Sequence, residues 1–265
     1  MIAKLAHVEW LKTRRRSAFW IATLSFVGLM LVGLGADYYA NTRAASYTYR
    51  PVWPGAIGSA EGFGMLIMMV LIVLLTASEK TWRTERQNVI DGLSRTHYFL
   101  GKLILLVGCI LAFWLGVALL ATLFEGLNRG LVTSAIDAPF IGRLHALQLV
   151  SVLLYLFFVG SLAFMFGTIC SSSGAALALA FLFLILQPPI SILMAREGGM
   201  LHEATAYLPM EVMQAFGSAR GWDAARLTEF NSRMRENGMP LSLGAGAAAA
   251  VLALYSALAC GVALW

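Results

Sequence analysis

The chain carries very little charge, and over one long stretch it carries none. Only 12% of its 265 residues are Asp, Glu, Lys or Arg, whereas about a quarter is usual in soluble domains. No charged residue occurs among the fifty residues from Ala146 to Ala195, although ~20 apolar residues are enough to cross a bilayer. An ordinary soluble fold is excluded. The sequence predicts an all-α integral membrane protein in which residues 1–265 form a single transmembrane domain.

Cysteine is also scarce. The three cysteines, Cys109, Cys170 and Cys260, lie inside apolar runs or at the end of one. None is in a loop where a disulfide could brace a secreted domain, so we interpret them as small apolar residues. The first apolar run is too long for a cleavable signal peptide, and we expect it to be a retained span.

The groups needed for catalysis are missing from the apolar runs. A serine nucleophile in the Ser171–Gly174 stretch would need a histidine base from another span, but the four histidines lie in loops or at span edges. His202-Glu203 is not followed by a second histidine at the metalloprotease spacing. Gly101-Lys102 lacks the rest of a phosphate-binding loop. We therefore expect no enzyme activity, no metal and no cofactor in this chain, and the absence of a basic stripe argues against nucleic acid.

Charge-free runs predict six spans, because a helix rising ~1.5 Å per residue must cover ~30 Å of hydrocarbon. The only cluster of turn-forming residues in the fifty-residue run is Cys170-Ser171-Ser172-Ser173-Gly174, which predicts a tight hairpin. We expect no ionisable residue within the spans, which disfavours an ion- or proton-coupled transporter. The predicted spans are about 18–36, 62–78, 103–124, 146–169, 174–195 and 243–265.

Charge also predicts the orientation. An even number of spans places both termini on one side, and the basic cluster before the first span favours the cytoplasmic side of the inner membrane. All four lysines fall in the segments this assigns to the inside, and ten of the fourteen acidic residues fall outside.

Two cytoplasmic segments have apolar residues at helical spacing. Residues 1–17 predict an amphipathic elbow helix in the headgroup layer, although the same charges could merely fix the topology. Segment 79–102 predicts a short helix along the membrane, because apolar side chains at a rough 3–4 spacing alternate with charges of both signs. Such side chains can anchor the helix in another protein's groove or simply lie against lipid.

In the segments predicted to lie outside the membrane, we expect only short helices and no separate folded domain. Segment 37–61 is rich in Tyr and Trp, which is typical of an interfacial aromatic cap. In segment 196–242 we expect two short helices. The first, Ala204 to Phe216, is bent or re-entrant at Pro209, and the second begins at Asp223 and stops at Gly238. Within the fifth span, a possible kink is formed by Gln187, Pro188 and Pro189.

Several of these residues match one known family. Glu79 at the end of the second predicted span, followed by Ser94-Arg95 and then Gly101-Lys102 at the start of the third, resembles the first cytoplasmic loop of permeases of the type-2 ATP-binding-cassette (ABC) exporter class. The run Glu9-Trp10-Leu11-Lys12-Thr13-Arg14-Arg15 is similar to the family's elbow. The hairpin at 170–174 and the break at Tyr207-Leu208-Pro209 also resemble it. Gly92 and Thr84-Glu85 depart from the family's usual Pro and Gly-Thr, which affects the expected length and tilt of the coupling helix.

The resemblance implies a six-span permease with an elbow helix, a cytoplasmic coupling helix and short extracytoplasmic helices between spans five and six. It implies that two ABC ATPase subunits bind below, carrying ATP and Mg²⁺, and that a second permease, either another copy or a close homologue, lies beside this one. The elbow residues are Glu9, Lys12, Arg14 and Arg15. The residues expected at the ATPase-coupling interface are Glu79, Trp82, Arg83, Glu85, Arg86, Val89, Ile90, Asp91, Leu93 and Arg95.

Two other functions remain open at this point. One is a non-transporting transducer or scaffold that passes ATP-driven motion to an envelope machine such as a pilus or motility complex. The other is a secondary transporter or channel. The apolar spans suit a lipid-like or amphipathic cargo, and the lack of charge within them disfavours a strongly charged small solute.

Overall fold

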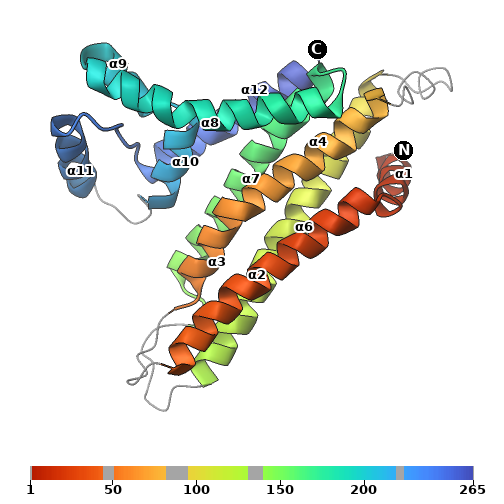
Figure 1. Ribbon diagram of the computed structural model, residues 1–265, viewed down its shortest axis with the longest axis horizontal. Coiled ribbons are helices and arrows are strands. Elements are labelled where there is room, and N and C mark those ends of the chain that lie inside the picture. The colour runs from red at the N-terminus through yellow and green to blue at the C-terminus, as the bar shows by residue number, and fades with distance from the viewer. Residues whose placement is uncertain (1, 44–50, 82–94, 131–139, 219–223, 265) are drawn as a thin grey trace.

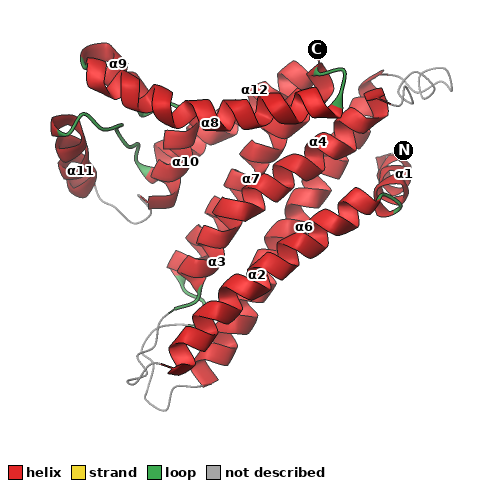
Figure 2. Cartoon of the chain, viewed as in Figure 1, coloured by secondary structure: helices red, strands yellow, loops and turns green. Residues whose placement is uncertain are grey.

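The computed structural model describes residues 2–43, 51–81, 95–130, 140–218 and 224–264, and every regular element in these ranges is a helix. Figure 1 shows the elements coloured along the chain, and Figure 2 shows the same view coloured by secondary structure. The predicted all-α membrane fold is confirmed. The elements are α1 (Ile2–Arg14), α2 (Ser17–Arg43), α3 (Trp53–Ser59), the π-helical segment η1 (Ala60–Gly64), α4 (Met65–Thr81), α6 (Arg95–Gly130), α7 (Arg143–Ile169), α8 (Ser173–Glu197), α9 (Gly199–Thr205), α10 (Pro209–Ser218), α11 (Ala224–Glu236) and α12 (Ala245–Leu264).

Six helices in the described ranges are long and apolar enough to cross a membrane, as the charge-free runs predict. The hairpin between the fourth and fifth is also confirmed, since α7 ends at Ile169 and the Ser172 hydroxyl caps α8 by accepting the Ala175 N–H. The six candidate spans are Ser17–Thr42, Trp53–Glu79, Thr96–Gly130, Leu144–Ile169, Ser173–Glu197 and Ala245–Leu264.

The second span is longer than the predicted 62–78. It begins at Trp53, which is fully buried and stacked on His145 with 4.9 Å between ring centroids. The start is fixed by the Val52 N–H, which donates to the buried Glu125 carboxylate at 3.0 Å. The prediction of an interfacial aromatic cap is therefore wrong for Trp53, because this ring lies inside the helix packing.

Glu61 lies within this second span, in the π-helical turn η1. The Tyr155 hydroxyl from α7 donates to the Glu61 main-chain carbonyl at 2.8 Å. A π turn disrupts the usual helical hydrogen bonding, and this contact gives the carbonyl a partner. The expectation that the spans contain no ionisable residue is wrong, because a charge-free run stops at Glu61 whereas the helix continues through it.

The interior of the bundle is built around two helices. Buried residues make up 61% of the most apolar window of the second span and 56% of the corresponding α7 window, but only 17% of that in α8. The second span and α7 therefore form the centre, while most of α8 faces outward. On the other side of the centre, α2 meets α6 through Phe26 and Phe113, whose rings are stacked at 4.4 Å.

In Figure 1, α2, α4 and α6 run beside one another, and α8 crosses the upper part of the bundle at an angle to them. The chain termini, the α7–α8 turn and the end of α4 all lie toward the right of this view. The helices α9 and α11 lie at the opposite end. An even number of crossings produces this separation, because it returns the chain to the side from which it started.

The segment between α8 and α12 contains α9, α10 and α11, and the predicted break at Pro209 and the predicted second helix are both confirmed. Asp223, its expected cap, lies outside the described residues. Gly238 ends α11 with a positive φ of 61°. The Met239 N–H bonds back to the Met234 carbonyl at 2.8 Å, which is a helix-terminating pattern that favours glycine.

Helices α4 and α7 approach closely at Gly167. A Cβ atom placed there would overlap the Thr76 hydroxyl oxygen and lie 3.0 Å from the Thr76 Cβ. The hydroxyl cannot move aside freely, because it donates to the Ile72 carbonyl one turn back at 2.7 Å. Gly167 is therefore required by the packing of the two central helices.

We predict that Gly167→Ala lowers the stability of the protein in detergent by ~1–3 kcal/mol, the usual cost of overpacking. Thermal unfolding followed by tryptophan fluorescence measures the effect. Gly108→Ala in α6 is the matched control, because nothing lies within 4 Å of the added methyl group there. Equal stability of the two variants would contradict the close contact, and adding Thr76→Ala to Gly167→Ala should recover part of the loss.

Candidate functional site

The amino-terminal helix turns its polar side toward the protein. In α1, Glu9 and Thr13 are buried, whereas Val8 and Leu11 are exposed. The part of the predicted apolar stripe that is described thus faces outward, and the predicted helix before the first span is confirmed. Its place in the headgroup layer stays a prediction. The elbow itself is fixed by the Trp20 indole N–H, which donates to the Arg14 carbonyl at 2.8 Å.

A buried lysine joins this helix to two others. Lys102 Nζ, on the first turns of α6, lies 2.6 Å from Glu9 Oε2 and 2.6 Å from Glu79 Oε1 at the end of α4. Its side chain is only 3% exposed. Because removing a charge from water is costly unless it is paired and hydrogen-bonded, both glutamates are needed to keep the ammonium group buried.

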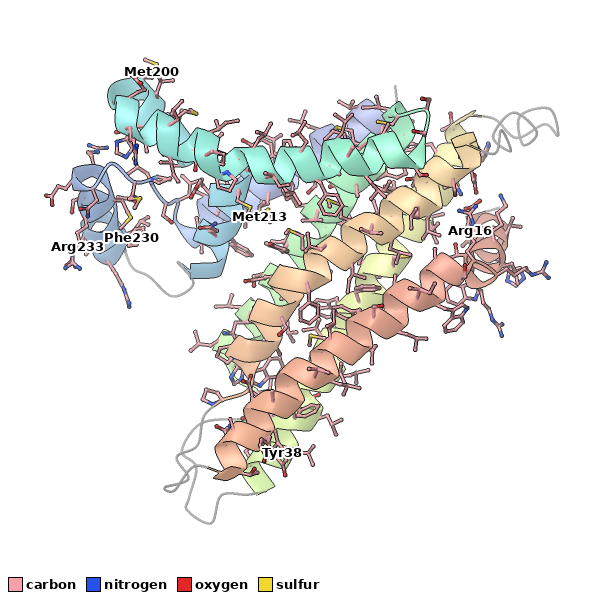
Figure 3. The ribbon with its side chains drawn as sticks, viewed as in Figure 1. Arg16, Tyr38, Met200, Met213, Phe230 and Arg233 are labelled. Carbon is pink, nitrogen blue, oxygen red and sulfur yellow. The ribbon has the colours of Figure 1, made fainter. Side chains whose placement is uncertain are left out.

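Further bonds extend the cluster to the elbow. Glu79 Oε1 lies 3.1 Å from Arg16 Nη2, and Glu79 Oε2 accepts a 2.9 Å hydrogen bond from the Tyr98 hydroxyl. Arg16 Nη1 donates to the Ser78 hydroxyl at 2.6 Å and to the Leu75 carbonyl at 3.1 Å. Figure 3 labels Arg16 beside the amino-terminal helix.

Lys12 completes the cluster at its more exposed edge, 3.1 Å from Glu9 Oε1. Two carboxylates are thus shared by three cations, and each carboxylate bridges at least two of them. We call Glu9, Lys12, Arg16, Glu79, Tyr98 and Lys102 the root cluster. It joins α1, the elbow, the end of α4 and the start of α6. The end of α4 and the start of α6 border the predicted coupling helix.

The structure brings together three of the predicted site residues, namely Glu9, Lys12 and Glu79. Arg14 and Arg15 are exposed and lie outside the root cluster. Arg95 begins α6, but its side chain is not described. The coupling-helix residues Trp82, Arg83, Glu85, Arg86, Val89, Ile90, Asp91 and Leu93 lie outside the described residues, so their interface role stays a prediction.

Sequence reasoning did not include Lys102, Arg16 or Tyr98 among the site residues. Lys102 carries a signal, because it forms the Gly-Lys pair through which the loop resembles the family. Arg16 belongs to the basic cluster before the first span, which the sequence analysis uses only to predict orientation. For Tyr98 no pattern in the sequence distinguishes it from an interfacial aromatic residue.

A second polar contact lies at the predicted kink of the fifth span. Helix α8 continues through Pro188 and Pro189. The buried Gln187 accepts the Met210 main-chain N–H through Oε1 at 2.6 Å, and the buried Ser191 hydroxyl donates to Glu211 Oε1 at 2.8 Å.

These bonds hold the first turn of α10 against the middle of α8. Burial raises the pKa of the Glu211 carboxyl, and the hydrogen bond from Ser191 opposes that rise. The kink is thus a docking point for another helix.

The described part of the chain is a six-span membrane bundle with an inward-turned elbow helix and a buried ion network at one end. A family model described as ABC-2 family transporter protein matches residues 38–210. This is more than half of the chain, which therefore belongs to that family and is a multi-pass permease of an ABC transporter. A search of curated proteins gave no match.

We predict that Lys102→Met lowers the free energy of unfolding by ~3–5 kcal/mol, because it leaves two buried carboxylates without their shared cation. Unfolding by SDS titration in mixed micelles measures this loss. Arg15→Met, which removes an exposed charge, should change the value by less than ~0.5 kcal/mol. The triple variant Glu9→Gln, Glu79→Gln and Lys102→Met should recover most of the loss. A triple variant no more stable than Lys102→Met would contradict the pairing.

Proposed function

We propose that this chain is the membrane half of an ATP-driven exporter, in which two ATPase subunits grip the cytoplasmic segment between α4 and α6. The observation that carries the proposal is the root cluster. Lys102 bonds at 2.6 Å to carboxylates on α1 and α4 and belongs itself to α6. A force applied between α4 and α6 therefore reaches three helices together.

In this proposal a partner subunit supplies the free energy for transport by hydrolysing ATP, since the sequence has no phosphate-binding loop. ATP and Mg²⁺ would be held by the ATPase subunits, whose closure would push the coupling helix toward the membrane. The root cluster would pass that displacement to α4 and α6, and the tight Gly167 contact would pass it from α4 to α7. Rigid-body movement of packed helices of this kind is a common switching mode.

The complex would contain a second permease, either another copy or a close homologue, with the cargo path between the two. Long apolar faces suit both lipid and such a neighbour. On α8 these include Ile185 and Leu193, each 67% exposed. Transport would run outward.

We predict that Trp82→Ala combined with Ile90→Ala weakens binding of the ATPase about 30-fold, the usual loss when an interface anchor is truncated. Co-purification of the ATPase in mild detergent and stimulation of its activity by the permease in nanodiscs measure the loss. The matched control is Ile21→Ala with Leu24→Ala, two outward-facing side chains of α2. Unchanged binding and stimulation in the coupling variant would refute the proposed interface.

Transport itself is tested separately, by reconstituting the complex in sealed vesicles. A complex that hydrolyses ATP under control of this chain but moves no cargo would favour the mechanical transducer instead of the exporter.

We predict that both termini face the cytoplasm. Single-cysteine variants Arg15→Cys in the turn after α1 and Thr228→Cys in α11 place a thiol at exposed positions in a chain whose native cysteines are replaced by serine. A membrane-impermeant maleimide added to intact spheroplasts should label the Thr228→Cys variant and spare the Arg15→Cys variant. Inside-out vesicles should give the reverse. The opposite pattern would place the coupling segment outside and overturn the proposed function.

A further inference from the structure

At the contact between α8 and α10, the Ser191 hydroxyl faces more hydrogen-bond acceptors than it has protons. The Ser191 hydroxyl has one proton, yet it lies 2.8 Å from Glu211 Oε1 and 3.0 Å from the Pro188 carbonyl. Pro188 itself has no N–H, so the Leu184 carbonyl one turn earlier loses its usual helical donor. Leu184, Pro188 and Ser191 share one helix face. The single Ser191 hydroxyl proton is therefore shared by the Glu211 carboxylate and the Pro188 carbonyl. The Leu184 carbonyl on the same face has no helical donor.

Glu211 differs from most of the other described glutamates in its surroundings. Glu9, Glu79, Glu125, Glu203 and Glu229 are each in an ion pair. Glu197 and Glu236 are exposed. Glu211 is half-buried, and among the described residues no Lys, Arg or His lies within 4.0 Å of its carboxylate. The Glu211 carboxylate can therefore bind a cation, because no described protein cation pairs with it and part of its surface is exposed.

The place is deep along the fifth span. Ser191 is 2% exposed, on the single face of α8 that packs inward. Gln187 is ten residues before the end of α8 at Glu197, or about 15 Å along the helix. Because Gln187 bonds directly to the Met210 N–H, the neighbouring Glu211 lies at nearly the same depth. Figure 3 shows α10, with Met213 labelled, lying against the middle of α8.

We propose that Glu211, Ser191 and the proline-broken turn of α8 form a binding site for the ammonium group of an amphipathic amine. An ammonium group offers a positive charge to the carboxylate and several N–H donors to the surplus oxygens. The apolar faces around it suit the amine's hydrocarbon part. Assigning this amine as the exported cargo rests on the proposed function, but binding does not.

Burial raises the pKa of Glu211 because no protein cation offsets the desolvation, and a bound ammonium group would supply that offset. A carboxyl in apolar surroundings reacts with a hydrophobic carbodiimide when it is protonated, so the reaction is run at a pH acidic enough to protonate the free Glu211 carboxyl. Protection from this reagent therefore reports occupancy of the site directly.

The experiment uses the purified full-length protein in nanodiscs, treated with dicyclohexylcarbodiimide and analysed by peptide mass spectrometry. We expect Glu211 to be modified, and octylammonium to protect it at concentrations at least about tenfold below those of octanol or octanoate, since a charge-assisted bond contributes that much affinity. No modification of Glu211, or equal protection by the three octyl compounds, would overturn the site.

Two variants separate binding from folding. Glu211→Gln keeps an acceptor for Ser191 but removes the charge, so its thermal midpoint without ligand should match that of the unmodified protein. Octylammonium should raise the midpoint of the unmodified protein and not that of Glu211→Gln. Glu203→Gln, which changes a carboxylate on α9 that is paired with Arg235, is the matched control and should retain the rise. An equal rise in Glu211→Gln would refute the site.

These outcomes are independent of the coupling interface. A protein that binds octylammonium at Glu211 but shows no ATPase partner would refute the exporter and retain the site. A complex in which the ATPase is coupled to this chain, but in which octylammonium does not selectively protect Glu211, would refute the site and retain the exporter.

Discussion

A single buried ammonium group determines how one end of this bundle, the end at which α1, α4 and α6 meet, is assembled. Lys102 is bonded to Glu9 and Glu79 at equal distances of 2.6 Å, so α1, α4 and α6 cannot separate there without exposing or stranding charge. The free-energy cost of breaking such a pair exceeds what the intact pair adds to stability. The interaction thus acts mainly as a constraint on geometry. Because it lies at both borders of the proposed coupling segment, the cluster would hold α1, α4 and α6 together under a force applied there.

The two halves of the bundle are packed differently. Around α4 and α7 the contacts are close and mostly apolar, and at Gly167 even an added methyl group would overlap the Thr76 side chain. Around α8 the packing is sparse, and the inward face relies on small or polar residues, of which Gln187 and Ser191 meet α10. A dense centre suits the transmission of force, whereas a sparse and polar periphery suits the entry of another molecule.

Much of this architecture was predictable from the sequence, because lipid allows few ways to satisfy a backbone. Six crossings, the hairpin at Ser172 and the break at Pro209 follow from long apolar runs and from residues that end helices. The predicted span boundaries were wrong where a membrane-spanning helix continues through a charged residue. Glu61 ended a charge-free run although the helix continues through it, because Tyr155 supplies the bond that the π turn needs. The partners of Lys102 could not be derived from spacing, since Glu9 is 93 residues away from it. Only a resemblance placed these residues in related motifs.

The π-helical turn at Ala60–Gly64 divides the second span into two lengths with different attachments. Before this turn, Trp53 is stacked on His145 and the preceding Val52 N–H donates to Glu125. After it, Glu79 is paired with Lys102 and Arg16. A π turn accommodates one more residue than an α turn, and rewinding it changes the angle between the side chains on either side. Rewinding this turn would let the Glu79 end of the span rotate while the Trp53 end stays in place, so that a twist applied near Glu79 would become a local change of helical pitch beside Tyr155.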